Sequence, residues 1–290
     1  MKEEDKYKEP YHFFDETEAM IAKSRIKWDK DKEQVWMELE ERMETEPVAE
    51  TISLIRPWLR VAIAAGIALL VGFAAFTGFY TKTIDIPSGQ HSEIYLPDNS
   101  KVSLNAQSAI SYKPLLWRFS RTVKLEGEAY FDVIKGKQFE VLSGKGKTVV
   151  LGTTFNIYSR NSDYLVTCIT GKVKVVEFSG SHEVTLSPGQ QAALNNDGTL
   201  TIEPGIDTDR IISWLNNKLS FTSVPLRKVF EEIGRQYGVI ISVPEDLDNT
   251  YTGTFIKESS VENVLNLVCK PFNLNFTRNA DNEYIITGNN

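Results

Sequence analysis

The stretch Val61–Thr81, VAIAAGIALLVGFAAFTGFYT, carries no charge and decides how the rest of the chain is organised. A helix of this length spans roughly 30 Å, which is the hydrocarbon thickness of a bilayer. A core helix rarely stays apolar on every face for so many turns, and a secretory signal peptide lies within about the first 15–30 residues. The stretch therefore predicts a single transmembrane helix, with domain boundaries at 59–81.

Basic residues predict the orientation of this helix. Arg56 and Arg60 precede it, whereas Lys82 alone follows it, with Asp85 close by. The positive-inside rule places the N-terminus in the cytoplasm and the larger C-terminal part outside.

Three glycines, Gly66, Gly72 and Gly78, interrupt the span. They would allow close packing with another helix, or local unwinding for an intramembrane protease. The simpler interpretation, which we favour, is that glycine is common in membrane helices.

The cytoplasmic segment, 1–55, is acidic and partly helical. The first 50 residues contain 16 Asp and Glu against 9 Lys and Arg, an excess that equals the net charge of −7, so the remainder is neutral. This distribution lacks the basic stripe of a nucleic-acid surface. Helical spacing of apolar residues across 17–45 predicts one or two amphipathic helices. We expect them to fold against a protein partner through Trp28, Val35, Trp36 and Leu39, the alternative being a solvated tether.

Cysteine and histidine are scarce. Cys168 and Cys269 lie on the same side of the span, where they are either a disulfide or, as we favour, two buried thiols. With three histidines and no Cys-X-X-Cys, the sequence predicts no metal site and no cofactor.

The segment 83–205 changes to a two-residue period. Short alternating runs separated by turn residues about every 8–12 positions are typical of an all-β sandwich or barrel. Gly127, Gly144 and Gly171 are among the residues predicted to separate strands. The predicted strands are Ser92–Leu96, Lys101–Leu104, Thr122–Leu125, Ala129–Val133, Phe139–Leu142, Thr148–Leu151, Phe155–Tyr158, Leu165–Thr170, Lys172–Phe178 and Glu183–Leu186.

Five motifs in this segment resemble those of the FecR family, inner-membrane regulators of sigma factors in Gram-negative bacteria. They occur in the family's order and at its spacings, which makes the resemblance specific. The motifs are LPDNSKVSLNAQSAISY (96–112), RTVKLEGEAYFDV (121–133), LGTTFNIY (151–158), TGKVKV (170–175) and LSPGQQA (186–192).

The resemblance gives some residues a specific interpretation. Asn99 stands where the family usually has Gly, and Asn also tolerates a left-handed turn. The run Gly127–Phe131 predicts a strand entered through a close-packed glycine. The Gly152–Thr153 bond matches one that cleaves itself in some relatives, by attack of the Thr hydroxyl on the preceding carbonyl. The alternative, which we favour, is a glycine at a tight strand turn.

The last segment, 214–288, predicts a βαβ-βαββ unit that forms a small split sheet with helices on one face. The expected order is a strand from Lys218, a helix from about Pro225 to Gly238, two strands, a helix behind a capping box at Ser259–Glu262, and two closing strands. This unit resembles the short N-terminal domain of secretins and TonB receptors.

The fold class expected overall is thus a multi-domain membrane protein: a short helical segment, one transmembrane helix, an all-β FecR domain and a small α+β domain. The resemblance implies an inner-membrane anti-sigma factor, not an enzyme, with a periplasmic C-terminus. Its implied partners are an extracytoplasmic-function sigma factor, the signalling domain of an outer-membrane TonB-dependent transducer, and membrane proteases. The alternatives are a membrane-anchored envelope enzyme or glycan-binding protein, and a structural scaffold.

Overall fold

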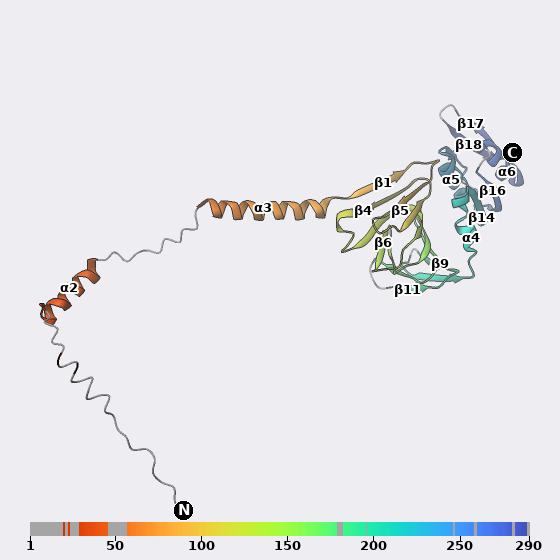
Figure 1. The fold of residues 1–290 in the computed structure, drawn as a ribbon. Coiled ribbons are helices and arrows are strands. Elements are labelled where there is room, and N and C mark those ends of the chain that lie inside the picture. Colours follow the sequence, from red (N-terminus) through yellow and green to blue (C-terminus); the bar gives the residue numbers. More distant parts are fainter. Residues whose placement is uncertain are drawn as a thin grey trace, which may run out of the picture. The chain divides into compact units, whose positions relative to one another are not determined.

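The computed structural model describes residues 20, 23, 29–45, 57–178, 182–195, 197–245, 247–257, 260–279 and 282–288. It divides into two units, Met1–Ala64 and Ala65–Asn290, which are described separately. Among the described residues, α2 (Lys32–Thr45) and α3 (Pro57–Phe79) precede the β-rich part of the chain (Figure 1).

α2 starts at a reciprocal cap. The Asp31 carboxylate accepts a hydrogen bond from the backbone N–H of Lys32, and the Asp31 N–H donates to the side chain of Gln34. This arrangement satisfies N–H groups that have no partner in the first turn of a helix. The rest of α2 mixes acidic and apolar residues, and its apolar side chains are largely exposed.

α3 contains most of the apolar stretch and starts at Pro57. Proline suits the first turn of a helix because it lacks an N–H. Within the described part, Trp58–Phe79 is the one helix long and apolar enough to cross a membrane, with a mean hydropathy of 2.2. The helix ends at Phe79, two residues before the uncharged stretch ends.

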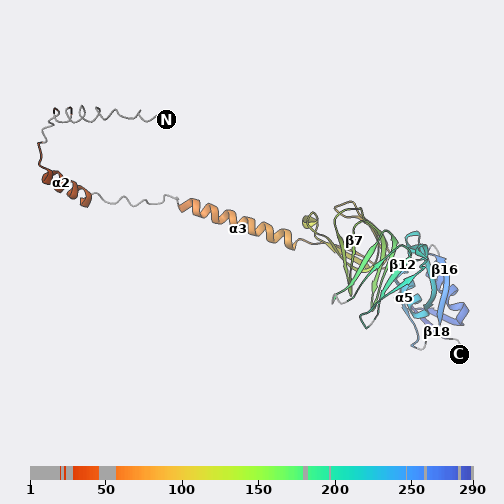
Figure 2. The ribbon, with the colours of Figure 1, turned by 90° about the horizontal axis from the view of Figure 1, so that it is seen from below.

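A 13-stranded sheet follows, folded over itself in two layers (Figure 2). Its central path runs β11-β10-β7-β6-β5-β8-β9-β12-β13. Off this path, β1 pairs with β4, β2 pairs with β3, and both β3 and β4 pair with β5. The strands are β1 (Lys82–Ile86), β2 (Ser92–Tyr95), β3 (Lys101–Leu104), β4 (Ser108–Tyr112), β5 (Arg121–Asp132), β6 (Phe139–Ser143), β7 (Gly146–Val150), β8 (Thr154–Arg160), β9 (Asp163–Thr170), β10 (Val173–Glu177), β11 (Glu183–Leu186), β12 (Gln190–Leu194) and β13 (Leu200–Pro204).

β5 connects the two layers, and here the predicted strand break at Gly127 is wrong. The first half of β5 pairs with β4 and β6, and the second half pairs with β3 and β8. Gly127 lies at the change of partners, with a φ of +95°. A Cβ there would lie 2.8 Å from the Cα of Ser108, so only glycine lets the strand pass from one layer to the other. The predicted close packing is correct, but the strand continues through it.

The Leu96–Ser100 turn is fastened to the start of β5. Asn99 has a φ of +64°, as expected for the residue that replaces glycine. The Asp98 carboxylate accepts two hydrogen bonds from the guanidinium of Arg121, which also donates to the carbonyls of Ile134 and Lys137. Arg121 is only 9% exposed. The largely buried Asp98–Arg121 ion pair therefore gives the turn motif and the β5 motif a structural role.

The C-terminal domain contains β14 (Lys218–Pro225), α5 (Leu226–Tyr237), β15 (Ile240–Ser242), β16 (Thr250–Ile256), α6 (Val261–Cys269), β17 (Leu274–Arg278) and β18 (Glu283–Gly288). The order of elements matches the prediction, but the predicted single split sheet is two sheets. β14 pairs with β16 alone, and β15 joins β18 in parallel beside β17. α4 (Thr208–Ile211) and a short 3-10 helix, Ser213–Asn216, link the two domains.

The N-terminal cap of α6 differs from the predicted capping box. Ser260 is the cap residue, and its hydroxyl accepts a hydrogen bond from the N–H of Asn263. Glu262 instead accepts a hydrogen bond from the hydroxyl of Tyr284. Ser259 lies outside the described residues.

The β-rich domain and the C-terminal domain each have a separate hydrophobic core. Cys168 is buried in the first core and Cys269 in the second, and both are free thiols. Burial raises the pKa of each thiol to about 11, so both stay protonated at neutral pH and are poor nucleophiles.

Candidate functional site

α2 carries apolar side chains on one face. Val35, Trp36, Leu39 and Met43 follow the spacing of three and four residues that places side chains on the same side of a helix. Trp36 is 68% exposed and Met43 75%. Trp28, which was predicted to join them, lies outside the described residues.

α3 carries the residues predicted for the membrane, namely Val61, Gly66, Gly72 and Gly78. A Cβ at any of the three glycines would meet no heavy atom within 4 Å. Packing within the described chain therefore gives no reason for these glycines, and their surface is open to lipid or to another helix.

The Gly152–Thr153 bond lies in the connection between β7 and β8. A Cβ on Gly152 would lie 2.4 Å from the Cα of Lys135, so close packing by itself requires glycine there. The Thr153 hydroxyl is buried and has no hydrogen-bond partner in the described chain. The site combines a steric explanation for Gly152 with an unengaged hydroxyl next to the preceding carbonyl.

The β-rich domain and the C-terminal domain meet through contacts at the edge of their interface. The backbone N–H of Gly89 donates to the carbonyl of Arg235 at 2.8 Å, and Lys257 Nζ donates to the Gly89 carbonyl at 3.0 Å. Lys228 forms an ion pair with Asp163. These contacts join the β1–β2 turn and the β8–β9 hairpin to α5 and the end of β16.

Gln236 forms the centre of the interface. It lies on α5 and is 1% exposed. Its amide nitrogen donates to Asn105 Oδ1 at 2.7 Å and to Glu232 Oε1 at 2.8 Å, while its oxygen lies 2.8 Å from His91 Nε2. The tautomer in which His91 carries the proton on Nε2 therefore completes the set of hydrogen bonds. Burial lowers the pKa of His91, which favours this neutral form.

Glu128 lies directly behind this group. Asn105 Nδ2 donates to one carboxyl oxygen at 2.7 Å, and Asn156 Nδ2 donates to the other at 2.9 Å. Burial, helped by the nearby Glu232 carboxylate, raises the pKa of Glu128 to about 7 against the opposing effect of the two amides and Arg160. The interface therefore contains a carboxyl group that titrates near neutral pH.

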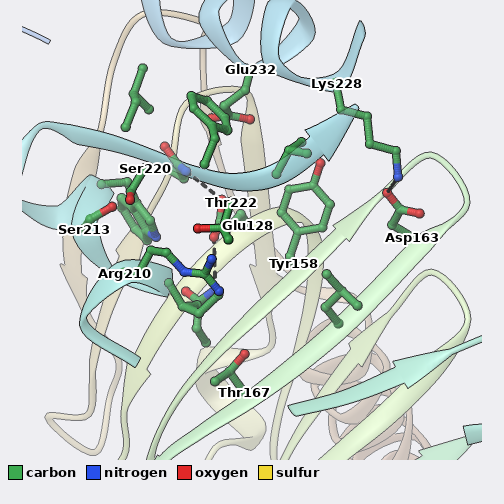
Figure 3. A pocket seen from close by; sticks show the side chains of 18 of the residues that line it. Glu128, Tyr158, Asp163, Thr167, Arg210, Ser213, Ser220, Thr222, Lys228 and Glu232 are labelled. Carbon is green, nitrogen blue, oxygen red and sulfur yellow. Dashed lines mark hydrogen bonds and ion pairs between the residues drawn. The ribbon is translucent and has the colours of Figure 1, made fainter. Parts of the chain in front are cut away.

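A cavity of about 380 Å³ opens beside Glu128 (Figure 3). Residues from β8 and β9 form one wall, and β14, α5 and the linker between the domains form the other. The close-up shows Glu128, Tyr158 and Glu232 around the space, with the Lys228–Asp163 pair at its margin. Asn156 Oδ1 and Trp214 Nε1 have no hydrogen-bond partner in the described part. The cavity can hold waters or a small polar molecule.

The sequence prediction did not include these interface residues, although a signal was present. Gln236 lies three residues after Ile233 and seven after Val229, so it falls on the apolar stripe of α5. A polar residue on a buried stripe requires a polar partner. The identity of that partner, Asn105, depends on a contact 131 residues away along the chain.

No cluster of three or more His, Cys, Asp or Glu suited to a metal ion occurs among the described residues.

Comparisons with known proteins agree with this architecture. The FecR protein model matches residues 82–174, and the model of the FecR C-terminal region matches residues 218–286. No curated protein matches the sequence. Two crystal structures described as a candidate anti-sigma factor from Parabacteroides distasonis ATCC 8503 are similar at 25% identity and a TM-score of 0.66. They cover 72% and 73% of this chain and 100% of their own. With both family domains present in order behind a membrane-length helix, the chain belongs to the FecR family.

Proposed function

We propose that this chain is a transmembrane anti-sigma factor that regulates an extracytoplasmic-function sigma factor. The observation that carries the proposal is the joint presence of the two FecR domains, together with a likeness to a candidate anti-sigma factor along the whole of its crystallised chain. Family and structural neighbour both support a role in anti-sigma signalling. The four segments 1–55, 59–81, 83–205 and 214–288 would then be the sigma-binding, anchoring, FecR and sensing parts.

The sigma factor would bind the apolar face of α2. Successive residues of a helix are rotated by about 100°, so Val35, Trp36, Leu39 and Met43 lie within an arc of roughly 100°. An exposed tryptophan flanked by aliphatic residues is the kind of anchor that dominates protein interfaces. Trp28 would extend the same contact.

The anchor would lie in the inner membrane with α2 in the cytoplasm. The bases before α3 and the single Lys82 after it support this orientation. The two outer domains would then lie in the periplasm. There they would meet the signalling domain of a TonB-dependent outer-membrane transducer.

The signal would cross the membrane by proteolysis. A single helix without a described neighbour transmits a change of shape poorly, whereas cutting it releases α2. Membrane proteases would cut near α3, whose glycines lower helix stability. The interface around Gln236 is a suitable point for the first step, because a partner that binds the C-terminal domain could disturb its hydrogen bonds.

Two variants of α2 test the central part of the proposal. Trp36→Ala removes the largest side chain of the apolar face and should abolish co-purification of the sigma factor with the full-length protein. Met37→Ala is the matched control, because Met37 is 65% exposed but points away from that face. Sigma binding that survives Trp36→Ala, Leu39→Ala and their combination would contradict the proposal.

Self-cleavage at Gly152–Thr153 is tested separately on denaturing gels. If the bond cleaves, wild type and Thr153→Ser give two fragments, and Thr153→Ala gives the full-length chain. Full-length wild type would show that Gly152 serves packing alone.

A further inference from the structure

The connection between β4 and β5 exposes apolar and basic side chains together. Its sequence is KPLLWRFS, residues 113–120. Phe119 is 85% exposed and Leu115 48%, and Lys113 and Arg118 are exposed beside them. Exposed apolar side chains grouped in this way commonly mark an interaction surface.

The fold keeps these side chains in place. Trp117, between them, is buried, and its ring lies 5.6 Å from that of Tyr112 and 6.0 Å from that of Phe139. The N–H groups of Phe119 and Ser120 both donate to the carbonyl of Leu116. The exposure of Phe119 is therefore a consequence of an anchored loop.

Chain connectivity places this loop next to the end of α3. β1 starts at Lys82, three residues after Phe79, and Lys82 pairs with Tyr112. Three residues reach at most about 10 Å. Lys113 Nζ also donates to the carbonyl of Gly78, at 2.6 Å. The loop therefore lies where the chain leaves α3 and β1 begins (Figure 1).

Two neighbouring loops contribute to the same surface. Arg121, directly after the first loop, donates to the carbonyls of Ile134 and Lys137, and the N–H of Gly136 donates to the carbonyl of Leu151. Ile134 is 49% exposed and Leu151 61%. We call the following residues the helix-proximal face: Lys113, Leu115, Arg118, Phe119, Ile134, Lys135, Lys137 and Leu151.

We propose that the helix-proximal face docks on the phospholipid surface around the C-terminal end of α3. The inference rests on the proposed membrane anchor. Its apolar side chains would enter the interfacial layer and its bases would contact lipid phosphates, as in other peripheral membrane contacts. The membrane is the occupant because the chain itself brings this face to the bilayer. Docking would fix the tilt of the FecR domain relative to the membrane. It would also hold Leu151 and Lys135, which flank the Gly152–Thr153 bond, near the membrane.

The test uses the full-length protein in vesicles of phosphatidylethanolamine and phosphatidylglycerol. A single reactive cysteine, Phe119→Cys, carries an environment-sensitive fluorophore, and lipids with a nitroxide near the headgroup act as quencher. Wild type treated in the same way checks that the buried Cys168 and Cys269 stay unlabelled.

The control position is Phe178, which is 54% exposed. Phe178 follows Glu177 at the end of β10, and Glu177 pairs with Gly146 at the start of β7. Arg121 pairs with Phe139, which lies beside Val150 at the other end of β7. Phe178→Cys therefore places the same fluorophore at the opposite end of the layer.

We expect quenching at residue 119 to exceed that at residue 178 at least about threefold, with a blue-shifted emission. Equal quenching at the two positions would overturn the proposal. A blue shift without quenching would also overturn it, because protein would then cover Phe119. Carbonate extraction of the same vesicles distinguishes the two failures. Release of the chain from the vesicles would contradict the membrane anchor, whereas retention of the chain without quenching at residue 119 would contradict only the docking.

Discussion

α2 and α5 are short helices that each carry apolar side chains three or four residues apart, and their surroundings are opposite. In α5, Leu226, Val229, Phe230 and Ile233 are fully buried against the sheets of their own domain. In α2, Trp36 is 68% exposed. The difference shows that periodicity identifies a face that must be covered, but not what covers it. α5 finds its cover within the chain, and we propose that α2 finds it in a sigma factor.

The largest expected effect comes from truncating one aromatic residue on each helix. Phe230→Ala should lower the free energy of unfolding of the C-terminal domain by about 3–5 kcal/mol, because it leaves a cavity in a closed core. Trp36→Ala should change it by less than about 0.5 kcal/mol. Thermal unfolding of the purified full-length variants measures both. A similar loss for the two variants would show that α2 is covered within the chain.

The titration of Glu128 tests whether burial at the interface between the β-rich domain and the C-terminal domain makes the free energy of unfolding depend on pH. Its pKa rises from an ordinary value of 4.5 to about 7 in the folded state. Between these values the folded state keeps a proton that the unfolded state has lost, so stability falls as pH rises. The loss should reach about 3 kcal/mol by pH 7.

Unfolding midpoints measured from pH 4.5 to 7.5 check this expectation. Glu128→Gln should flatten the slope, whereas Glu126→Gln, an exposed position on the same strand, should keep the wild-type slope. A wild-type slope in Glu128→Gln would assign the pH dependence to another group.

A smaller effect distinguishes buried from exposed contacts between the β-rich domain and the C-terminal domain. Gln236→Ala removes the hydrogen bonds that Gln236 makes to Asn105, Glu232 and His91 inside the interface and should cost about 1–3 kcal/mol. Lys228→Ala breaks only the half-exposed pair with Asp163 and should cost less than about 1 kcal/mol. Unfolding midpoints and protease sensitivity of the linker around Trp214 report both losses. Equal effects would mean that the Gln236 cluster does not hold the domains together.

Most of the fold follows from local pattern. The apolar stretch, the alternating strands and the stripe of α5 each appear within about ten to twenty consecutive residues, and α3, α5, α6 and most strands lie where these patterns place them. Strands β1, β4, β12 and β13 were not predicted, because they are short and their runs mix small and polar residues.

Pairings distant in sequence explain the other differences. Gly127 resembles a strand break until its neighbour Ser108 is known, because the steric need for glycine comes from the other strand. The two small sheets of the C-terminal domain resemble one sheet for the same reason. The cluster of Asn105, Glu128 and Gln236 could not be predicted because no local pattern indicates which polar groups will meet.

Hydrogen exchange of the full-length protein, alone and with its sigma factor, tests the central claim most directly. Amides of residues 32–45 should exchange almost freely in the protein alone and become protected when the sigma factor binds, because a short helix is marginal without tertiary packing. Amides of α5 should be protected in both states. Protection of residues 32–45 in the protein alone, or exchange that the sigma factor leaves unchanged, would contradict the account.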